Sequence, residues 1–83
     1  MTRFKWTEWS LEKVAAHGIL PDEIEYAFDR RIGPHQERAD GYCETIGTIP
    51  SGRAILIVWR PDRVYDALEA VAVGEGVFVI TAY

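Results

Sequence analysis

Five side chains of this sequence combine the chemistry of proton transfer with that of phosphate binding. Lys13 and His17 are four residues apart in a segment that predicts a helix, so both lie on one helical face. The imidazole of a histidine titrates near neutral pH, which suits a general acid or base. Arg53 and Arg60 stand at the two ends of one predicted strand, and guanidinium groups bind phosphate through paired hydrogen bonds. Tyr83 adds a phenol that could donate a proton.

Each of these residues also has an ordinary structural explanation, and the sequence leaves both explanations open. A histidine in the last turn of a helix can cap the final carbonyl groups and complements the helix dipole, and His17 fits this description. Arg53 follows a predicted turn, where an arginine at the start of a strand is commonly solvated. Tyr83 is compatible with a plain aromatic residue after the last strand.

A denser group of basic residues falls within positions 30–38. It contains Arg30, Arg31, His35 and Arg38, and such a cluster could contact RNA phosphates or an acidic partner segment. The alternative is that the arginines compensate the dipole of the preceding helix and that the remaining residues lie in a solvated loop. The sequence therefore offers this group as a candidate RNA- or partner-binding surface.

The sequence predicts no cofactor and no metal site. His17, His35 and the scattered carboxylates have no recognisable metal-ligand spacing, and Gly74–Gly76 is too short for a phosphate-binding loop. Cys43 is the single cysteine, so it cannot form an internal disulfide, and it has no neighbour that would activate it as a nucleophile. The tryptophans are expected to supply core and interface area rather than base stacking: Trp6, Trp9 and Trp59.

Composition limits the kind of protein that carries these groups. The chain has 83 residues, 48% hydrophobic and 27% charged, which predicts one small folded domain over residues 1–83. A net charge of −4 argues against a uniformly basic nucleic-acid binder. No apolar run approaches the roughly 20 residues that cross a bilayer, and the N-terminus lacks the apolar stretch of a secretory signal. We expect a cytoplasmic protein without membrane association.

Two helices are expected to position the first group of residues. Thr7 is a plausible N-cap for a helix over 8–17, and Gly18 fits the left-handed residue that follows a helix. Pro21 suits the first position of a second helix, which ends at Arg30 and Arg31. The predicted core-facing stripes are Leu11, Val14 and Ala15 in the first helix, and Ile24, Ala27 and Phe28 in the second.

Alternation and turn signals predict four strands around these helices. The strands cover 3–6, 42–49, 53–60 and 77–82, with a loop at 32–41, a turn at 50–52, a break at Pro61-Asp62, an ambiguous element at 63–73 and a turn at 74–76. The order β-α-α-β-β-β predicts an α+β domain with a helical hairpin on one face of a small antiparallel sheet. Because two strands are apolar on both sides, the other face should be partly apolar, and a homodimer is one way to cover it.

Three motifs resemble a known family in their order and spacing. The first runs Trp6-Thr7-x-x-Ser10-x-x-Lys13-x-x-x-His17-Gly18-Ile19-x-Pro21-x-Glu23-Ile24-Glu25, the second is a Gly52-Arg53 turn, and the third is a last strand with Val79-Ile80-Thr81-Ala82. In these segments the chain is similar to the BrnT toxins of the wider RelE-like superfamily. Where that family has an arginine after the last strand, this chain has Tyr83.

The resemblance implies a RelE-like fold and the toxin of a toxin-antitoxin system. Such a toxin would be a metal-independent endoribonuclease, with RNA as its substrate and an antitoxin protein as its inhibitor. Metal-free RNA cleavage needs a base for the 2′-hydroxyl, an acid for the leaving oxygen and cations for the phosphorane charge. The candidates are Lys13, His17, Arg53, Arg60 and Tyr83. The alternative is a non-catalytic domain of the same fold that binds another protein or a second copy of itself.

Overall fold

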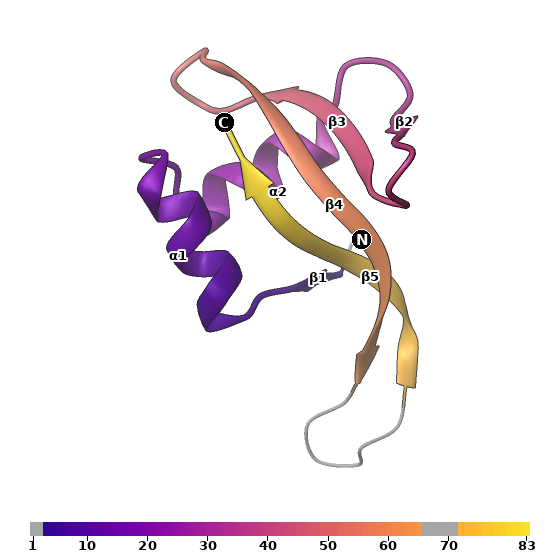
Figure 1. Cartoon of the computed structure of the whole chain (residues 1–83). Coiled ribbons are helices and arrows are strands. Elements are labelled where there is room, and N and C mark those ends of the chain that lie inside the picture. Colours follow the sequence, from indigo (N-terminus) through magenta and orange to yellow (C-terminus); the bar gives the residue numbers. More distant parts are fainter. Residues whose placement is uncertain (1–2, 66–71) are drawn as a thin grey trace.

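The computed structural model describes residues 3–65 and 72–83, in which two helices lie over one face of a sheet (Figure 1). The elements follow one another as β1 (Phe4–Lys5), α1 (Glu8–Ala16), α2 (Pro21–Asp29), β2 (Gln36–Glu37), β3 (Cys43–Thr48), β4 (Ala54–Tyr65) and β5 (Ala72–Ala82). The predicted α+β class, with both helices on one face, is confirmed. No helix in this part of the chain is long and apolar enough to cross a membrane.

The sheet is mixed, and the prediction of a wholly antiparallel sheet is wrong. Its strand order is β1-β5-β4-β3-β2, and every neighbouring pair is antiparallel except β1 with β5, which is parallel. Phe4 lies opposite Val77, whose N–H donates to the carbonyl of Arg3 at 2.8 Å. A parallel pair needs a long connection between its strands, and here the rest of the fold provides it. The loop expected at 32–41 also contains β2, which pairs with β3.

Helix α1 begins at the predicted cap but turns a different side toward the sheet. The backbone N–H of Ser10 donates to the Thr7 hydroxyl, and the backbone N–H of Thr7 donates to the Ser10 hydroxyl. Because the serine is fully paired in this capping box, it can be buried together with Val14. Leu11 and Ala15, which were expected in the core, are exposed. A polar residue with its own partners therefore displaces the apolar stripe.

Helix α2 follows the sequence closely. It starts at Pro21, and the predicted stripe of Ile24, Ala27 and Phe28 is buried. A Cβ atom at Gly47 of β3 would overlap the backbone carbonyl of Ala27, so the absence of a side chain lets α2 lie directly on the sheet. The chain between the two helices turns at Gly18, whose φ of +71° is the left-handed value expected after a helix.

Strands β4 and β5 form a longer hairpin than the turn signals predict. Pro61 was expected to break the strand, yet it lies opposite Val77 within the ladder. The ladder between β3 and β4 ends at Cys43 opposite Trp59. Beyond that point no strand of residues 3–65 and 72–83 lies on this side of β4, so a proline is tolerated there. The turn predicted at 74–76 lies inside β5, opposite 62–64 of β4. Of the ambiguous element at 63–73, both ends are strand and residues 66–71 lie outside the described residues.

The sheet has a covered face, beneath the helices, and an open face. The covered face holds the main core, with Phe4 and Trp6 packed at its edge: Val14, Ile19, Ile24, Ala27, Phe28, Cys43, Ile49, Ile55, Ile57, Trp59, Val77, Val79 and Ala82. The open face holds a smaller cluster of Val58, Phe78 and Ile80, against which Tyr42 packs. The expectation that this second face is partly apolar is confirmed.

Candidate functional site

Two of the predicted site residues meet at the end of the sheet where β5 finishes. The ring centroids of His17 and Tyr83 lie 5.7 Å apart, with a tilt of 45° between the rings. His17 is the C-cap of α1, and its backbone N–H donates to the carbonyl of Val14. The N–H and carbonyl of Tyr83 both bond to Leu56 of β4, at 3.0 and 2.8 Å. The backbone thus fixes both residues, while their side chains are exposed, Tyr83 by 51%.

The His17 side chain is chemically available. Among residues 3–65 and 72–83 it takes part in no hydrogen bond or ion pair, so its ring nitrogens are open to a ligand. Side-chain capping, the structural explanation offered by the sequence, is therefore not seen among these residues, and His17 is the C-cap of α1 through its backbone N–H alone. The backbone of His17 can therefore end helix α1 while its side chain remains available for proton transfer.

Arg53 lies at the same end of the sheet as this pair. It follows the β3–β4 turn, and its carbonyl accepts a hydrogen bond from Ile49 at 2.9 Å. Leu56, three residues further along, is the backbone partner of Tyr83. At about 3.3 Å per residue, the Cα atom of Arg53 is about 10 Å along the strand from that pairing. In Figure 1 the β3–β4 turn and the C-terminus lie together.

Lys13 is one helical turn before His17 and lies beside an aromatic ring. Its ammonium nitrogen is 4.8 Å from the ring centroid of Trp9, which is 49% exposed. Of the core and interface area predicted for the tryptophans, Trp9 does not supply the core part, because it belongs to neither hydrophobic cluster of the described residues. Trp59 is buried and donates to the Thr45 hydroxyl at 2.9 Å. The i, i+4, i+8 spacing of Trp9, Lys13 and His17 was the signal in the sequence that could have placed Trp9 beside Lys13.

Arg60 is not part of this group. It lies on the open face inside β4, where its guanidinium is 3.5 Å from the Asp62 carboxylate and 5.0 Å from the Phe78 ring centroid. The predicted strand end at Arg60 is wrong, because β4 continues to Tyr65. Arg53 and Arg60 are about 23 Å apart along the strand, at 3.3 Å per residue, so one phosphate cannot bridge them.

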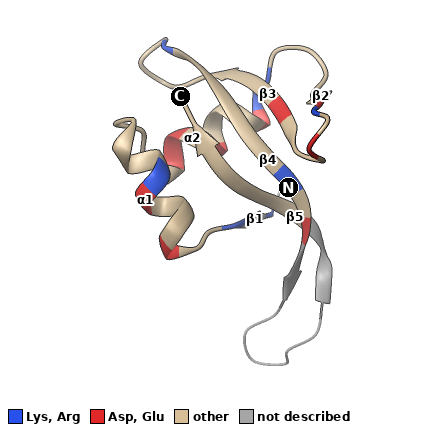
Figure 2. Cartoon of the chain, in the orientation of Figure 1, with Lys and Arg blue, Asp and Glu red and all other residues tan. Residues whose placement is uncertain are grey.

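The basic group at 30–38 is engaged in local structure. Among the residues coloured by charge in Figure 2, basic and acidic positions are interspersed along the chain. Each member has a partner within the described chain. Arg30 lies over the Tyr26 ring at 4.0 Å, Arg31 donates to the Phe28 carbonyl at 3.2 Å, the His35 ring meets that of Trp59 at 5.5 Å, and Arg38 pairs with Asp40 at 3.0 Å and Glu44 at 3.6 Å.

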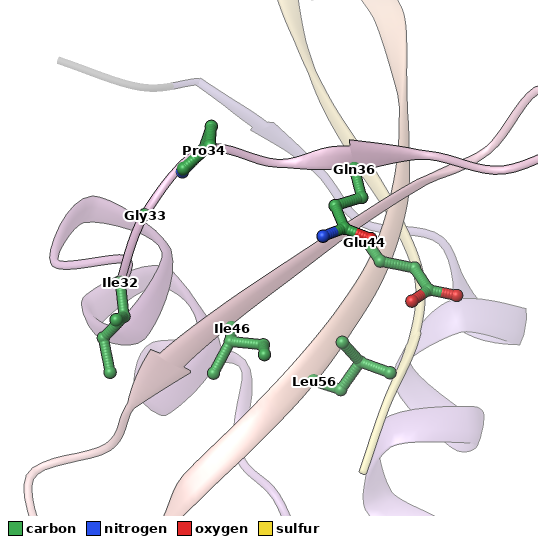
Figure 3. A pocket seen from close by; sticks show the side chains of 7 residues that line it. All are labelled: Ile32, Gly33, Pro34, Gln36, Glu44, Ile46 and Leu56. Atoms are coloured by element: carbon green, nitrogen blue, oxygen red, sulfur yellow. The ribbon is translucent and has the colours of Figure 1, made fainter.

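The sequence did not indicate a hollow that lies on the open face (Figure 3). It measures about 260 Å³, and it is lined by Ile32, Gly33, Pro34, Gln36, Glu44, Ile46 and Leu56. Ile46 is 49% exposed although it stands in the middle of β3. The alternation of residues along β3 predicts that Ile46 points away from the core, and this was the signal in the sequence that could have indicated the hollow.

Cys43 and the carboxylates contribute no further reactive centre to the described part of the chain. Burial raises the pKa of the Cys43 thiol, and the nearby charge of Glu37 raises it further, so the reactive thiolate is disfavoured. No three histidine, cysteine, aspartate or glutamate side chains within that part gather closely enough to hold a metal ion.

Comparisons with models of protein families, with curated proteins and with solved structures find no match. Function depends on sites rather than on folds, so the geometry of this site bears on it most directly. That geometry brings together His17 and Tyr83, places Arg53 at the same end of the sheet, and separates Arg60 from them.

Proposed function

We propose that this chain is a metal-independent endoribonuclease of a toxin-antitoxin system, with a RelE-like fold and a catalytic centre at His17 and Tyr83. The observation that supports this proposal is the exposed contact of an imidazole with a phenol, 5.7 Å between centroids, beside the turn that carries Arg53. The motifs shared with BrnT toxins and the α+β plan of two helices on one sheet support the same proposal.

The proposed reaction needs one base, one acid and one cation. His17 accepts the proton of a ribose 2′-hydroxyl, whose oxygen attacks the adjacent phosphorus. The bond from phosphorus to the 5′-oxygen breaks, and the Tyr83 phenol gives its proton to that oxygen, which leaves a 2′,3′-cyclic phosphate. The Arg53 guanidinium offsets the charge that develops on the phosphorane oxygens. Lys13, one turn before His17, is placed to hold a neighbouring phosphate.

Expression in a bacterial host, with growth and bulk mRNA followed together, tests the proposal. The wild-type chain should arrest growth and fragment mRNA, and the purified protein should cleave RNA in the presence of EDTA. His17→Ala should abolish both effects. His35→Ala is the matched control, because His35 also packs against an aromatic ring, that of Trp59. Continued toxicity of His17→Ala, or normal growth with abundant soluble wild-type protein, would contradict the proposal.

The hollow on the open face favours a second candidate function, self-association. Ile46 and Leu56 present apolar side chains there, and Glu44 and Arg38 add charges of both signs nearby. A two-fold dimer requires a surface that complements itself, and a patch with both signs of charge meets this requirement.

Sedimentation at high protein concentration tests this second candidate. A dimer should be lost in Ile46→Glu and kept in Leu11→Glu, which alters an apolar residue of α1 that is 39% exposed. A wild-type chain that remains monomeric would refute self-association.

A further inference from the structure

Helix α1 carries a straight row of side chains that leads to the proposed catalytic pair. Trp9, Lys13 and His17 succeed one another at intervals of four residues, and each interval advances about 6 Å along a helix and only about 40° around it. Tyr83 extends the row because its ring contacts His17. We call these four residues the α1 row.

Among the described residues, Trp9 belongs to neither hydrophobic cluster, so packing in the core does not account for a tryptophan at this position. Its indole is half exposed, whereas Trp6 donates to Glu25 at 3.1 Å and Trp59 donates to Thr45 at 2.9 Å. Within the described ranges, the Trp9 indole nitrogen makes no hydrogen bond. Tryptophan is usually among the more buried side chains, so an exposed ring on a short helix is available for a ligand.

Lys13 is also unneutralised. In the part of the chain that the structure describes it forms no ion pair, and its recorded contact is with the Trp9 ring. An exposed contact between an ammonium and an aromatic ring is weak, whereas an ammonium bound to a phosphate makes a charge-assisted hydrogen bond. A ligand that offers a phosphate beside a planar ring would therefore draw the ammonium away from the indole and leave the ring for stacking.

Single-stranded nucleic acid has this chemistry. Its unpaired bases stack on exposed aromatic rings, and its backbone places a phosphate beside each base. Trp9 and His17 are about 12 Å apart along the helix axis, at 1.5 Å per residue, so a strand on Trp9 reaches His17 within a few nucleotides. Glu8 and Glu12 flank the row on the same helix, which predicts modest, salt-dependent affinity.

We propose that Trp9 and Lys13 form a subsite for single-stranded RNA, in which one base stacks on the indole and an adjacent phosphate binds the ammonium. The subsite would deliver the next phosphodiester to His17, and in this respect the inference rests on the proposed function. The substrate class is then unpaired RNA rather than a duplex, whose bases cannot reach the ring.

Fluorescence anisotropy with a labelled, fully 2′-O-methylated single-stranded oligonucleotide tests binding without cleavage. Trp9→Ala should weaken binding by about tenfold or more, and Trp9→Phe should restore most of it. Lys13→Ala should weaken binding and lower the slope of affinity against salt by about one unit. Leu11→Ala, on the same helix but outside the α1 row, should bind as the wild type does.

The outcomes separate the subsite from the catalytic proposal. If the wild type cleaves RNA but Trp9→Ala binds normally, the subsite is wrong and the nuclease stands. If the chain binds through Trp9 and Lys13 without cleaving RNA, the subsite stands and the catalytic proposal falls. If the wild type neither binds nor cleaves, both are refuted.

Discussion

Among the places where this molecule sets a cation beside an aromatic ring, the α1 row and the open face of the sheet differ in exposure and in neighbouring charge. In the α1 row, the Lys13 ammonium is 4.8 Å from the Trp9 ring. On the open face, Lys5 and Arg60 lie 5.3 and 5.0 Å from the Phe78 ring. Phe78 is only 9% exposed, whereas Trp9 is 49% exposed.

The neighbouring charge completes the contrast. The Asp62 carboxylate is 3.2 Å from the Lys5 ammonium and 3.5 Å from the Arg60 guanidinium, so both cations of the open-face group share a counter-ion. No such carboxylate pairs with Lys13 within the described residues. A cation near a ring therefore does not identify a binding site.

The strongest test of this comparison is to remove the two rings. Phe78→Ala should destabilise the fold by about 3 kcal/mol, because it empties the apolar cluster of the open face. Trp9→Ala should cost under about 1 kcal/mol, because the ring is half exposed. Urea unfolding of both variants measures the difference. Equal losses of stability would show that Trp9 is a structural residue.

The second test removes the shared carboxylate. Asp62→Asn should lower the free energy of unfolding by about 1 kcal/mol at low salt, and the loss should shrink in ~1 M salt, because its partners are partly exposed. Glu12→Gln is the control, since Glu12 forms no ion pair in the described ranges. A loss that does not respond to salt would mean that Asp62 acts through something other than these ion pairs.

The smallest effect is expected for the cation of the α1 row. Lys13→Gln should change the free energy of unfolding by about 0.5 kcal/mol or less, because an exposed cation–ring contact is weak. Thermal unfolding of this variant and of Arg60→Gln measures the difference. Arg60→Gln should lose more stability, because the Arg60 guanidinium also pairs with Asp62. The opposite ranking would place Lys13 among the residues that hold the fold together.

Parts of the fold could be predicted where local signals agree. Helix α2 has its proline at the first position and its three buried residues on one face, so the sequence alone located both its start and its core side. The core side of α1 could not be predicted in this way, because Ser10 is buried only through its bonds with Thr7. The continuation of β4 through Pro61 depends on where β3 ends, which no local pattern encodes.

The candidate site shows the same division between local and long-range information. The helical spacing of Lys13 and His17 was evident from the sequence, but their relation to Tyr83 depends on how β5 pairs with β4. Trp9 was expected to supply core or interface area, because hydrophobicity alone does not reveal which side of a helix meets the sheet. Arg60 was assigned to the site because the strand was expected to end there.

The parallel pairing of β1 with β5 delays the completion of the sheet during folding and synthesis. Phe4 and its partner Val77 are separated by 73 positions in the sequence, and contacts of such long range slow folding. During synthesis, β1 leaves the ribosome first and must wait several seconds for its partner, at about 5–20 residues per second. Tyr83 comes later still. The proposed centre at His17 and Tyr83 would therefore assemble only after residues 77–83 have emerged from the ribosome.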